Sequence, residues 1–232
     1  MFSVALIGPD GSGKTTIARR LEASFPGRFK YLYMGINAES SNVTLPTTRI
    51  AEWIKHLLDN GQAGKPRHQA SQATARSRGR VWSTLRMLNR FAEEIFRYAL
   101  SWIYKKQRRI VIFDRFFKFD FACDPVELSR MPMSERLHRI WLSKLYPYPD
   151  LIIFLDAPPE VLFARKPETT LQFLSERQRA ILMAGKALSN IVRVDAARPL
   201  EDVYSEVEHC VMNFRRSPHR NSYPPGIARG RQ

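Results

Sequence analysis

The amino-acid sequence predicts an α/β fold in which a doubly wound parallel sheet of five strands carries helices on both faces. Two observations support this class. Five short runs rich in Val, Ile, Leu and Phe lack the alternation of a half-exposed strand, which is typical of strands covered on both sides. Helical patterns separate these runs along the 232 residues, and in such a β–α alternation ligands bind at the carboxyl ends of the strands.

The elements follow in order. The predicted strands are Ser3–Ile7, Phe29–Met34, Ile110–Phe113, Leu151–Leu155 and Ile191–Val194. The predicted helices are Lys14–Ser24, Thr47–Leu58, Val81–Lys106, Ser134–Leu145, Glu160–Ala164, Leu171–Leu188 and Leu200–Phe214. We expect one domain over residues 1–214, least regular at about 35–80, and a basic tail over 215–232 whose composition is typical of disorder.

The net charge of +15 is concentrated in two segments. Residues 62–80 and 215–232 each carry five Lys or Arg and no acid. Two interpretations stay open: ordinary solvated segments, or attraction to a polyanion or an anionic membrane surface. We favour the first for the tail and the second for residues 62–80.

Composition excludes several classes of protein. Cys123 and Cys210 are too few for a disulfide framework, so a reduced, cytoplasmic location is expected. The longest apolar run, Leu151–Ala164, is too short and too interrupted by Asp156 and prolines to span a bilayer.

The strongest motif lies between the first strand and the first helix. Residues Gly8–Thr15 fit G-x-x-x-x-G-K-[ST], a loop whose backbone N–H groups surround phosphates at a helix N-terminus. In this motif Lys14 reaches the outer phosphates and the Thr15 hydroxyl can bind Mg²⁺. The sequence therefore predicts a site for ATP with Mg²⁺.

A second polar pair, Asp114-Arg115, stands at the end of the third strand. Carboxyl ends of parallel strands meet at one edge of the sheet, so this pair is expected to face the phosphate loop. The carboxylate can hold a magnesium-bound water or orient an acceptor, and the arginine can bind an anion through two hydrogen bonds.

Four blocks together resemble the thymidylate kinase family. They are Gly8–Thr16, Val111–Phe116, Pro149–Val161 and Val194–Val203, in the order that the family keeps. The resemblance implies a nucleoside-monophosphate-kinase fold with strand order 2-3-1-4-5, ATP as donor, and often a homodimer. It also implies that Asp10 points to the acceptor sugar, that Asp114 belongs to the magnesium and acceptor site, and that Arg115 contacts the acceptor phosphate.

The resemblance further implies a small lid, placed here at about residues 165–179. Ser12 leaves the phosphate loop without an arginine, and in that arrangement lid cations assist the transferring phosphoryl group. Arg165, Lys166, Arg177 and Arg179 are the candidates, with Arg165 favoured and Arg177 and Arg179 evenly balanced against exposed helix charge.

The acceptor side departs from the family pattern at two places. The Arg-Glu-Pro-Gly that follows the second strand is replaced by Met34-Gly35-Ile36-Asn37, and a run of phenylalanines follows Arg115. Arg86, Arg90 and Arg97 share one helix face and can supply a phosphate contact, or form a solvated stripe. Asp120 can anchor an acceptor sugar or form a turn.

The expected site is therefore as follows. The catalytic residues are Lys14, Asp114, Arg115 and Arg165; Gly8, Asp10, Gly11, Ser12, Gly13, Lys14, Thr15, Thr16 and Arg165 bind the nucleotide; Asp10, Arg90, Arg97, Asp114, Arg115 and Asp120 bind the acceptor; and Thr15 and Asp114 bind the metal.

The expected activity is ATP- and Mg²⁺-dependent phosphoryl transfer to a small acceptor, foremost a nucleoside monophosphate such as dTMP. Two alternatives remain. One is a kinase of a nucleoside, sugar or other polyol, including polysaccharide precursors. The other is an ATP-dependent regulatory protein that binds a polyanion.

Overall fold

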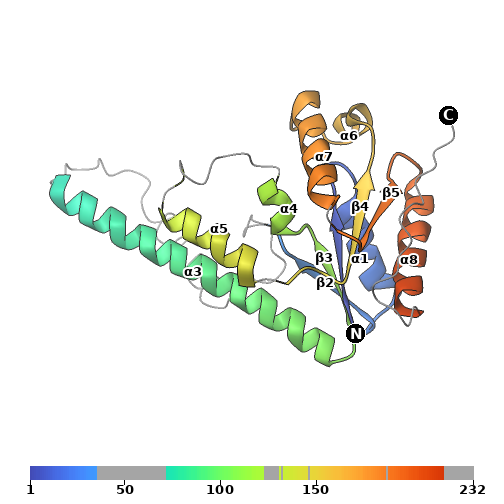
Figure 1. Ribbon diagram of the computed structural model, residues 1–232, viewed down its shortest axis with the longest axis horizontal. Coiled ribbons are helices and arrows are strands. Elements are labelled where there is room, and N and C mark those ends of the chain that lie inside the picture. Colours follow the sequence, from blue (N-terminus) through green and yellow to red (C-terminus); the bar gives the residue numbers. More distant parts are fainter. Residues whose placement is uncertain (36–71, 123–130, 132, 146, 187, 217–232) are drawn as a thin grey trace, which may run out of the picture.

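The computed structural model describes residues 1–35, 72–122, 131, 133–145, 147–186 and 188–216 (Figure 1). Its centre is a five-stranded sheet in which every pairing is parallel. The strands are β1 (Ser3–Ile7), β2 (Phe29–Tyr33), β3 (Ile110–Asp114), β4 (Leu151–Asp156) and β5 (Ile191–Asp195). Their order is β2-β3-β1-β4-β5, which confirms the predicted α/β class and strand order.

Helices cover both faces of this sheet. They are α1 (Lys14–Ser24), α3 (Gln72–Lys106), α4 (Phe117–Ala122), α5 (Met133–Leu145), α6 (Pro159–Arg165), α7 (Leu171–Gly185) and α8 (Leu200–Arg216). Helix α3 begins at Gln72 rather than at Val81 because Ala and Arg, both strong helix formers, outweigh Gly79 in the added stretch. Helix α4 was not predicted. The expected helix Thr47–Leu58 lies outside the described residues.

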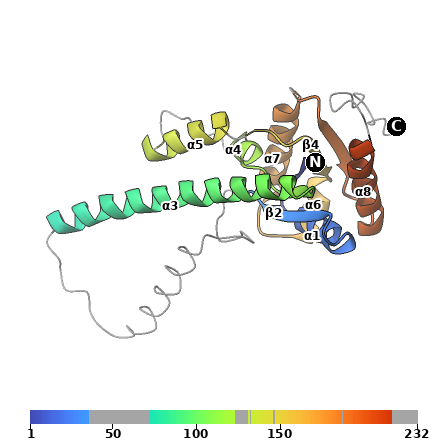
Figure 2. The same cartoon turned by 90° about the horizontal axis from the view of Figure 1, so that it is seen from below.

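Alternate residues of β1 divide the core in two. Val4 and Leu6 pack with α1 and α8, whereas Ala5 and Ile7 pack with residues of α4, α5 and α7 on the other face. All five residues of β1 are buried, which explains the continuous apolar run in the sequence. Figure 2 shows that α3 extends well beyond the sheet on the second face.

Among the described residues, no helix is both long enough and apolar enough to cross a lipid bilayer.

Candidate active site

The phosphate loop connects β1 to α1 and depends on two glycines. Gly8 and Gly11 have φ values of 151° and 84°, and a Cβ on them would lie 2.5 Å from the Leu155 carbonyl oxygen and 2.7 Å from that of Leu162. The loop therefore lies so close against β4 and α6 that a side chain at either position would collide with backbone atoms. This is the conformation expected from the motif.

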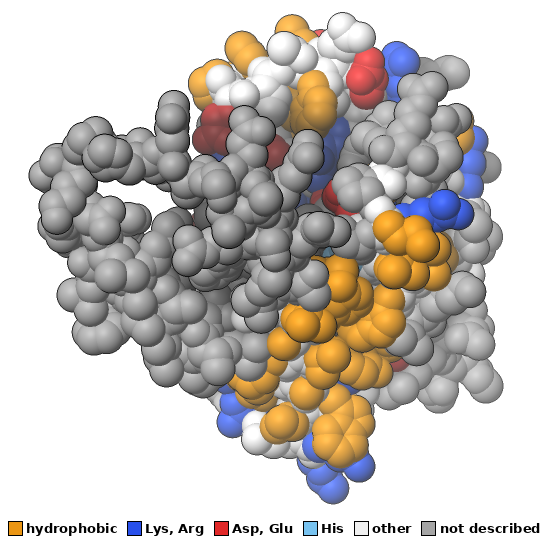
Figure 3. All heavy atoms as spheres, turned by 90° about the vertical axis from the view of Figure 1, so that its left-hand side faces the viewer, with side chains coloured by type: hydrophobic (Ala, Val, Ile, Leu, Met, Phe, Trp, Pro, Cys, Tyr) orange, Lys and Arg blue, Asp and Glu red, His pale blue; other side chains and the backbone are white. Residues whose placement is uncertain are grey.

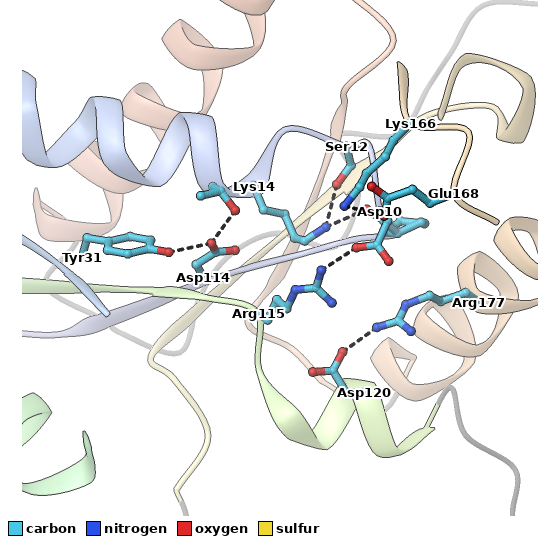
Figure 4. Close-up of polar contacts among 12 residues, drawn as sticks. Asp10, Ser12, Lys14, Tyr31, Asp114, Arg115, Asp120, Lys166, Glu168 and Arg177 are labelled. Carbon is cyan, nitrogen blue, oxygen red and sulfur yellow. Dashed lines mark hydrogen bonds and ion pairs between the residues drawn. The ribbon is translucent and has the colours of Figure 1, made fainter. Parts of the chain in front are cut away.

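Lys14 begins α1, and its side chain lies inside the loop. Its ammonium group donates to the Pro9 carbonyl oxygen at 2.6 Å and to Ser12 Oγ at 3.3 Å (Figure 4). Burial, followed by the neighbouring Arg115 cation, lowers the pKa of Lys14 to about 8. A buried cation in this state gains from an anion placed beside it, and a phosphate is such an anion.

The carboxylate of Asp114 ends β3 directly beside the start of α1. Its Oδ2 accepts from Thr15 Oγ1 at 2.6 Å and from the Tyr31 hydroxyl at 2.9 Å. Its Oδ1 is buried and has no hydrogen-bond partner among the described residues. Hydroxyl and carboxylate oxygens are the ligands that Mg²⁺ takes, so Thr15 and the open Oδ1 fit a phosphate-bound Mg²⁺.

Arg115 follows Asp114 in a left-handed backbone conformation with φ 68°. Its backbone N–H still donates to the Leu6 carbonyl oxygen at 3.1 Å, while its guanidinium donates to Asp10 Oδ1 at 2.5 Å. Burial raises the pKa of Asp10, but the Arg115 and Lys14 cations outweigh burial and leave it below its usual value. Asp10 is therefore an ionised partner of Arg115.

A second ion pair lies next to the first. Arg177 of α7 donates to Asp120 Oδ1 of α4 at 2.6 Å, and both side chains are mostly buried. Burial raises the pKa of Asp120 above its usual value, although the Arg177 cation acts in the opposite direction. A small cavity is lined by Lys14, Arg115, Asp120 and Arg177, so three cations from three different elements converge on one space.

Other expected site residues lie elsewhere. Arg97 is buried and donates to the backbone carbonyls of Tyr33 at 3.4 Å and Gly35 at 3.2 Å, where β2 ends. Arg165 donates to the carbonyls of Ala196 at 2.7 Å and Ala197 at 3.3 Å, beyond β5. Thr16 is exposed, and the side chain of Arg90 lies outside what the structure describes. The roles expected of these four residues stay predictions.

The Asp120–Arg177 pair was not found from the sequence. Its two residues are 57 positions apart, and Asp120 lies on the unpredicted helix α4. The available signal was an isolated acid among the phenylalanines of residues 116–121, a pattern in which a buried carboxylate needs a cation from another element.

Comparison with known proteins gives one family. The family model described as thymidylate kinase matches residues 7–207. A probable thymidylate kinase of Metallosphaera sedula is 26% identical over 212 residues, which cover 88% of this chain and 89% of that protein. A probable thymidylate kinase of Sulfolobus acidocaldarius is 25% identical over 222 residues, which cover 92% of this chain and 98% of that protein. A probable thymidylate kinase of Archaeoglobus fulgidus is 32% identical over 111 residues, which cover 45% of this chain and 54% of that protein.

The lowered pKa of Lys14 predicts a stability effect. The unfolded chain holds this proton up to a pKa of 10.5 and the folded chain only to about 8, so the charged lysine destabilises the fold below pH 8. The unfolded state binds more protons between these values, and the penalty therefore fades as pH rises towards 10.5. We expect Lys14→Met to raise the free energy of unfolding by on the order of 1–3 kcal/mol at pH 7.

Urea unfolding at pH 7 and pH 10 measures this effect. The gain from Lys14→Met should shrink at the higher pH, and the exposed Lys186→Met should show no gain at either pH. A Lys14→Met variant that is less stable than the parent at pH 7 would contradict the account of a buried cation that its neighbours offset only in part.

Proposed function

This chain belongs to the thymidylate kinase family and is a P-loop phosphotransferase, and from that premise we propose that it transfers the γ-phosphoryl group of ATP, held with Mg²⁺, to a nucleoside monophosphate such as dTMP. The observation that supports this most is the convergence of Lys14, Arg115 and Arg177 on one cavity at the carboxyl edge of the sheet (Figure 4). Three cations that converge in this way are suited to phosphate groups.

The ionised state of Asp10 favours a phosphate acceptor over a hydroxyl. A hydroxyl acceptor needs a base for its proton, and a phosphate monoester does not because its second pKa is about 6. Asp10 and Asp120 are each bound to an arginine, and the pKa of Asp10 is lowered by Arg115 and Lys14 despite burial. Asp10 is therefore a weak base, whereas the arginines are suited to hold an anion.

The residues then act in the following way. Lys14 and the loop N–H groups bind the outer phosphates of ATP. Thr15 and Asp114 would hold the Mg²⁺ ion, which would supply positive charge to those phosphates. Arg115 orients the acceptor phosphate. An acceptor oxygen attacks the γ-phosphorus as the bond to the ADP oxygen breaks, and no proton transfer is required. Positioning and charge neutralisation supply most of the acceleration.

An acceptor panel tests the proposal. With ATP and Mg²⁺ we expect phosphorylation of a nucleoside monophosphate, dTMP foremost, detected as the diphosphate by ³¹P NMR and absent with Lys14→Met. Phosphorylation of thymidine or a sugar with no nucleoside monophosphate turned over would favour the hydroxyl alternative. Nucleotide-dependent binding of a polyanion without any phosphorylated acceptor would favour the regulatory alternative.

Arg177 is our choice for the lid cation that meets the transferring group. It lines the cavity with Lys14, whereas the expected Arg165 is bound to carbonyl groups beyond β5. Asp120 fixes the Arg177 guanidinium in place, and a positioned arginine contributes roughly 10³–10⁵ in rate in related chemistry.

We therefore expect Arg177→Gln to lower kcat by about 10²–10³ with little change in ATP affinity. Arg216→Gln, an exposed arginine at the end of α8, serves as the matched control. Steady-state kinetics with the acceptor found by the panel measures the effect. An equal loss in Arg165→Gln and none in Arg177→Gln would reverse the assignment.

We also propose that a second copy of the chain covers one face of α3. This helix turns polar residues inwards, since Glu93, Glu94, Arg97 and Ser101 are buried. It turns Leu88, Ile95 and Trp102 outwards, each more than half exposed. Figure 3 shows hydrophobic side chains gathered in a continuous patch on one side of the molecule. A large contiguous apolar patch on the surface is typical of an interface.

The spacing of this exposed stripe suits a two-fold interface. Leu88, Ala92, Ile95, Ala99 and Trp102 alternate at four and three residues, the spacing of a helix–helix seam. If two α3 helices pack antiparallel about Arg97, each Ala92 lies opposite Trp102 of the other copy and each Ile95 lies opposite its Ala99. These two contacts each pair a small residue with a large one, and they are reciprocal, as in a closed two-fold dimer.

Light scattering tests the dimer. We expect twice the chain mass of 26.9 kDa, and a single chain mass for Ile95→Glu. The control is Leu137→Glu on α5, a residue with the same 53% exposure as Ile95 but outside the stripe. A parent protein that is monomeric at micromolar concentration would refute the proposal, as would an Ile95→Glu dimer.

The expected contact with polyanions stays a prediction. Residues 62–71 and 217–232, which hold much of the excess basic charge, lie outside the described part of the chain.

A further inference from the structure

The two oxygens of the Asp114 carboxylate have different surroundings. Asp114 is only 1% exposed, so each oxygen depends on protein or ligand groups for its hydrogen bonds. Oδ2 accepts two, from Thr15 Oγ1 at 2.6 Å and from the Tyr31 hydroxyl at 2.9 Å. Oδ1 accepts none from the described residues. One oxygen is saturated, and the other is left for a group outside this part of the chain.

Tyr31 supplies the second donor from a different element. It lies on β2, two residues before the position that pairs with Asp114, and its 6% exposed ring belongs to the core between the sheet and α1. Figure 4 shows the phenol directed along the sheet edge at the carboxylate, on the side away from Arg115. Because packing fixes the ring, the hydroxyl has little freedom to follow a rotating carboxylate.

Thr15 cannot fix the carboxylate in the same way. Its hydroxyl is itself an expected ligand of Mg²⁺. Tyr31 is not an expected ligand, and its ring also contacts the Arg19 guanidinium, 5.7 Å from the ring centroid. Groups that hydrogen-bond a metal ligand from behind orient it, and their loss typically weakens metal binding by about 10–100-fold. The Tyr31 hydroxyl stands in that relation to Asp114.

We propose that Tyr31 is a positioning residue, which holds Asp114 Oδ2 and so keeps Oδ1 directed at the cation that accompanies the nucleotide. This inference rests on the proposed Mg²⁺–nucleotide function. It adds a residue from β2 to a site otherwise built from the loop, α1, β3, α4 and α7.

The experiment measures binding rather than turnover. Titration calorimetry gives the affinity of ADP for the parent protein and for Tyr31→Phe, each in excess Mg²⁺ and in EDTA. Tyr31→Phe keeps the ring and removes the hydroxyl alone. We expect the Mg²⁺-dependent gain in ADP affinity to fall by about tenfold, while the affinity in EDTA changes by less than about twofold.

The matched control is Tyr204→Phe. Tyr204 on α8 is also a buried tyrosine of the same core cluster, at 7% exposure, and takes no part in the site. It should leave the Mg²⁺-dependent gain unchanged. If hydroxyl loss acted only through the packing of the core, both variants would lower ADP affinity with and without Mg²⁺.

The outcomes separate the two proposals. A parent protein whose ADP affinity does not respond to Mg²⁺ would refute the nucleotide function, and the role of Tyr31 with it. A parent protein that responds, together with a Tyr31→Phe variant that responds equally, would refute the role of Tyr31 and leave the kinase function standing. An equal loss in EDTA and in Mg²⁺ would also refute it.

Discussion

The site depends first on the pairing of β1 with β3. The register sets Leu6 opposite Asp114, so the phosphate loop that follows β1 and the Asp114-Arg115 pair that follows β3 leave the sheet side by side. Thr15 can then reach Asp114 at 2.6 Å across 99 residues of chain. A shift of the register by one residue would turn Asp114 to the other face of the sheet, away from α1. The chemistry is therefore a consequence of how two buried strands align.

The second constraint is the balance of charge within the cavity. Lys14, Arg115 and Arg177 line one cavity, and a buried cluster of cations is unfavourable unless nearby oxygens offset its charge. The carboxylates of Asp10 and Asp120 offset two of the three cations, and backbone and Ser12 oxygens offset the third. The protein thus holds its cations ready in a fixed arrangement, with temporary partners that phosphate groups are chemically able to replace.

Much of this was predictable from local pattern. The phosphate loop is a contiguous motif flanked by a strand and a helix, and the five strands were visible as apolar runs, so the fold and the place of Lys14 and Thr15 followed directly. Strand β5 is the exception to the expected burial, because of its five residues only Val194 is buried. Tyr31 was not found, and Arg177 was only one of four candidates for the lid cation. Their importance arises from contacts between elements far apart in the chain, with Asp114 and Asp120, and neither lies in a recognisable motif. Helix α3 reverses the usual pattern, because its apolar stripe is on the outside and the side chains it buries, among the described residues, are polar.

The backbone of Arg115 has a consequence for how this position can change over evolution. A side chain in the left-handed region costs about 1–2 kcal/mol relative to glycine, so folding alone would select glycine after β3. Arginine is present there nonetheless, with its guanidinium turned to Asp10. If Arg115 holds the acceptor as proposed, a lineage released from that need would drift towards glycine at this position and gain stability as it did so. Among related sequences, the residue at this one strand end should separate the chains that still select an anionic acceptor from those that have lost it.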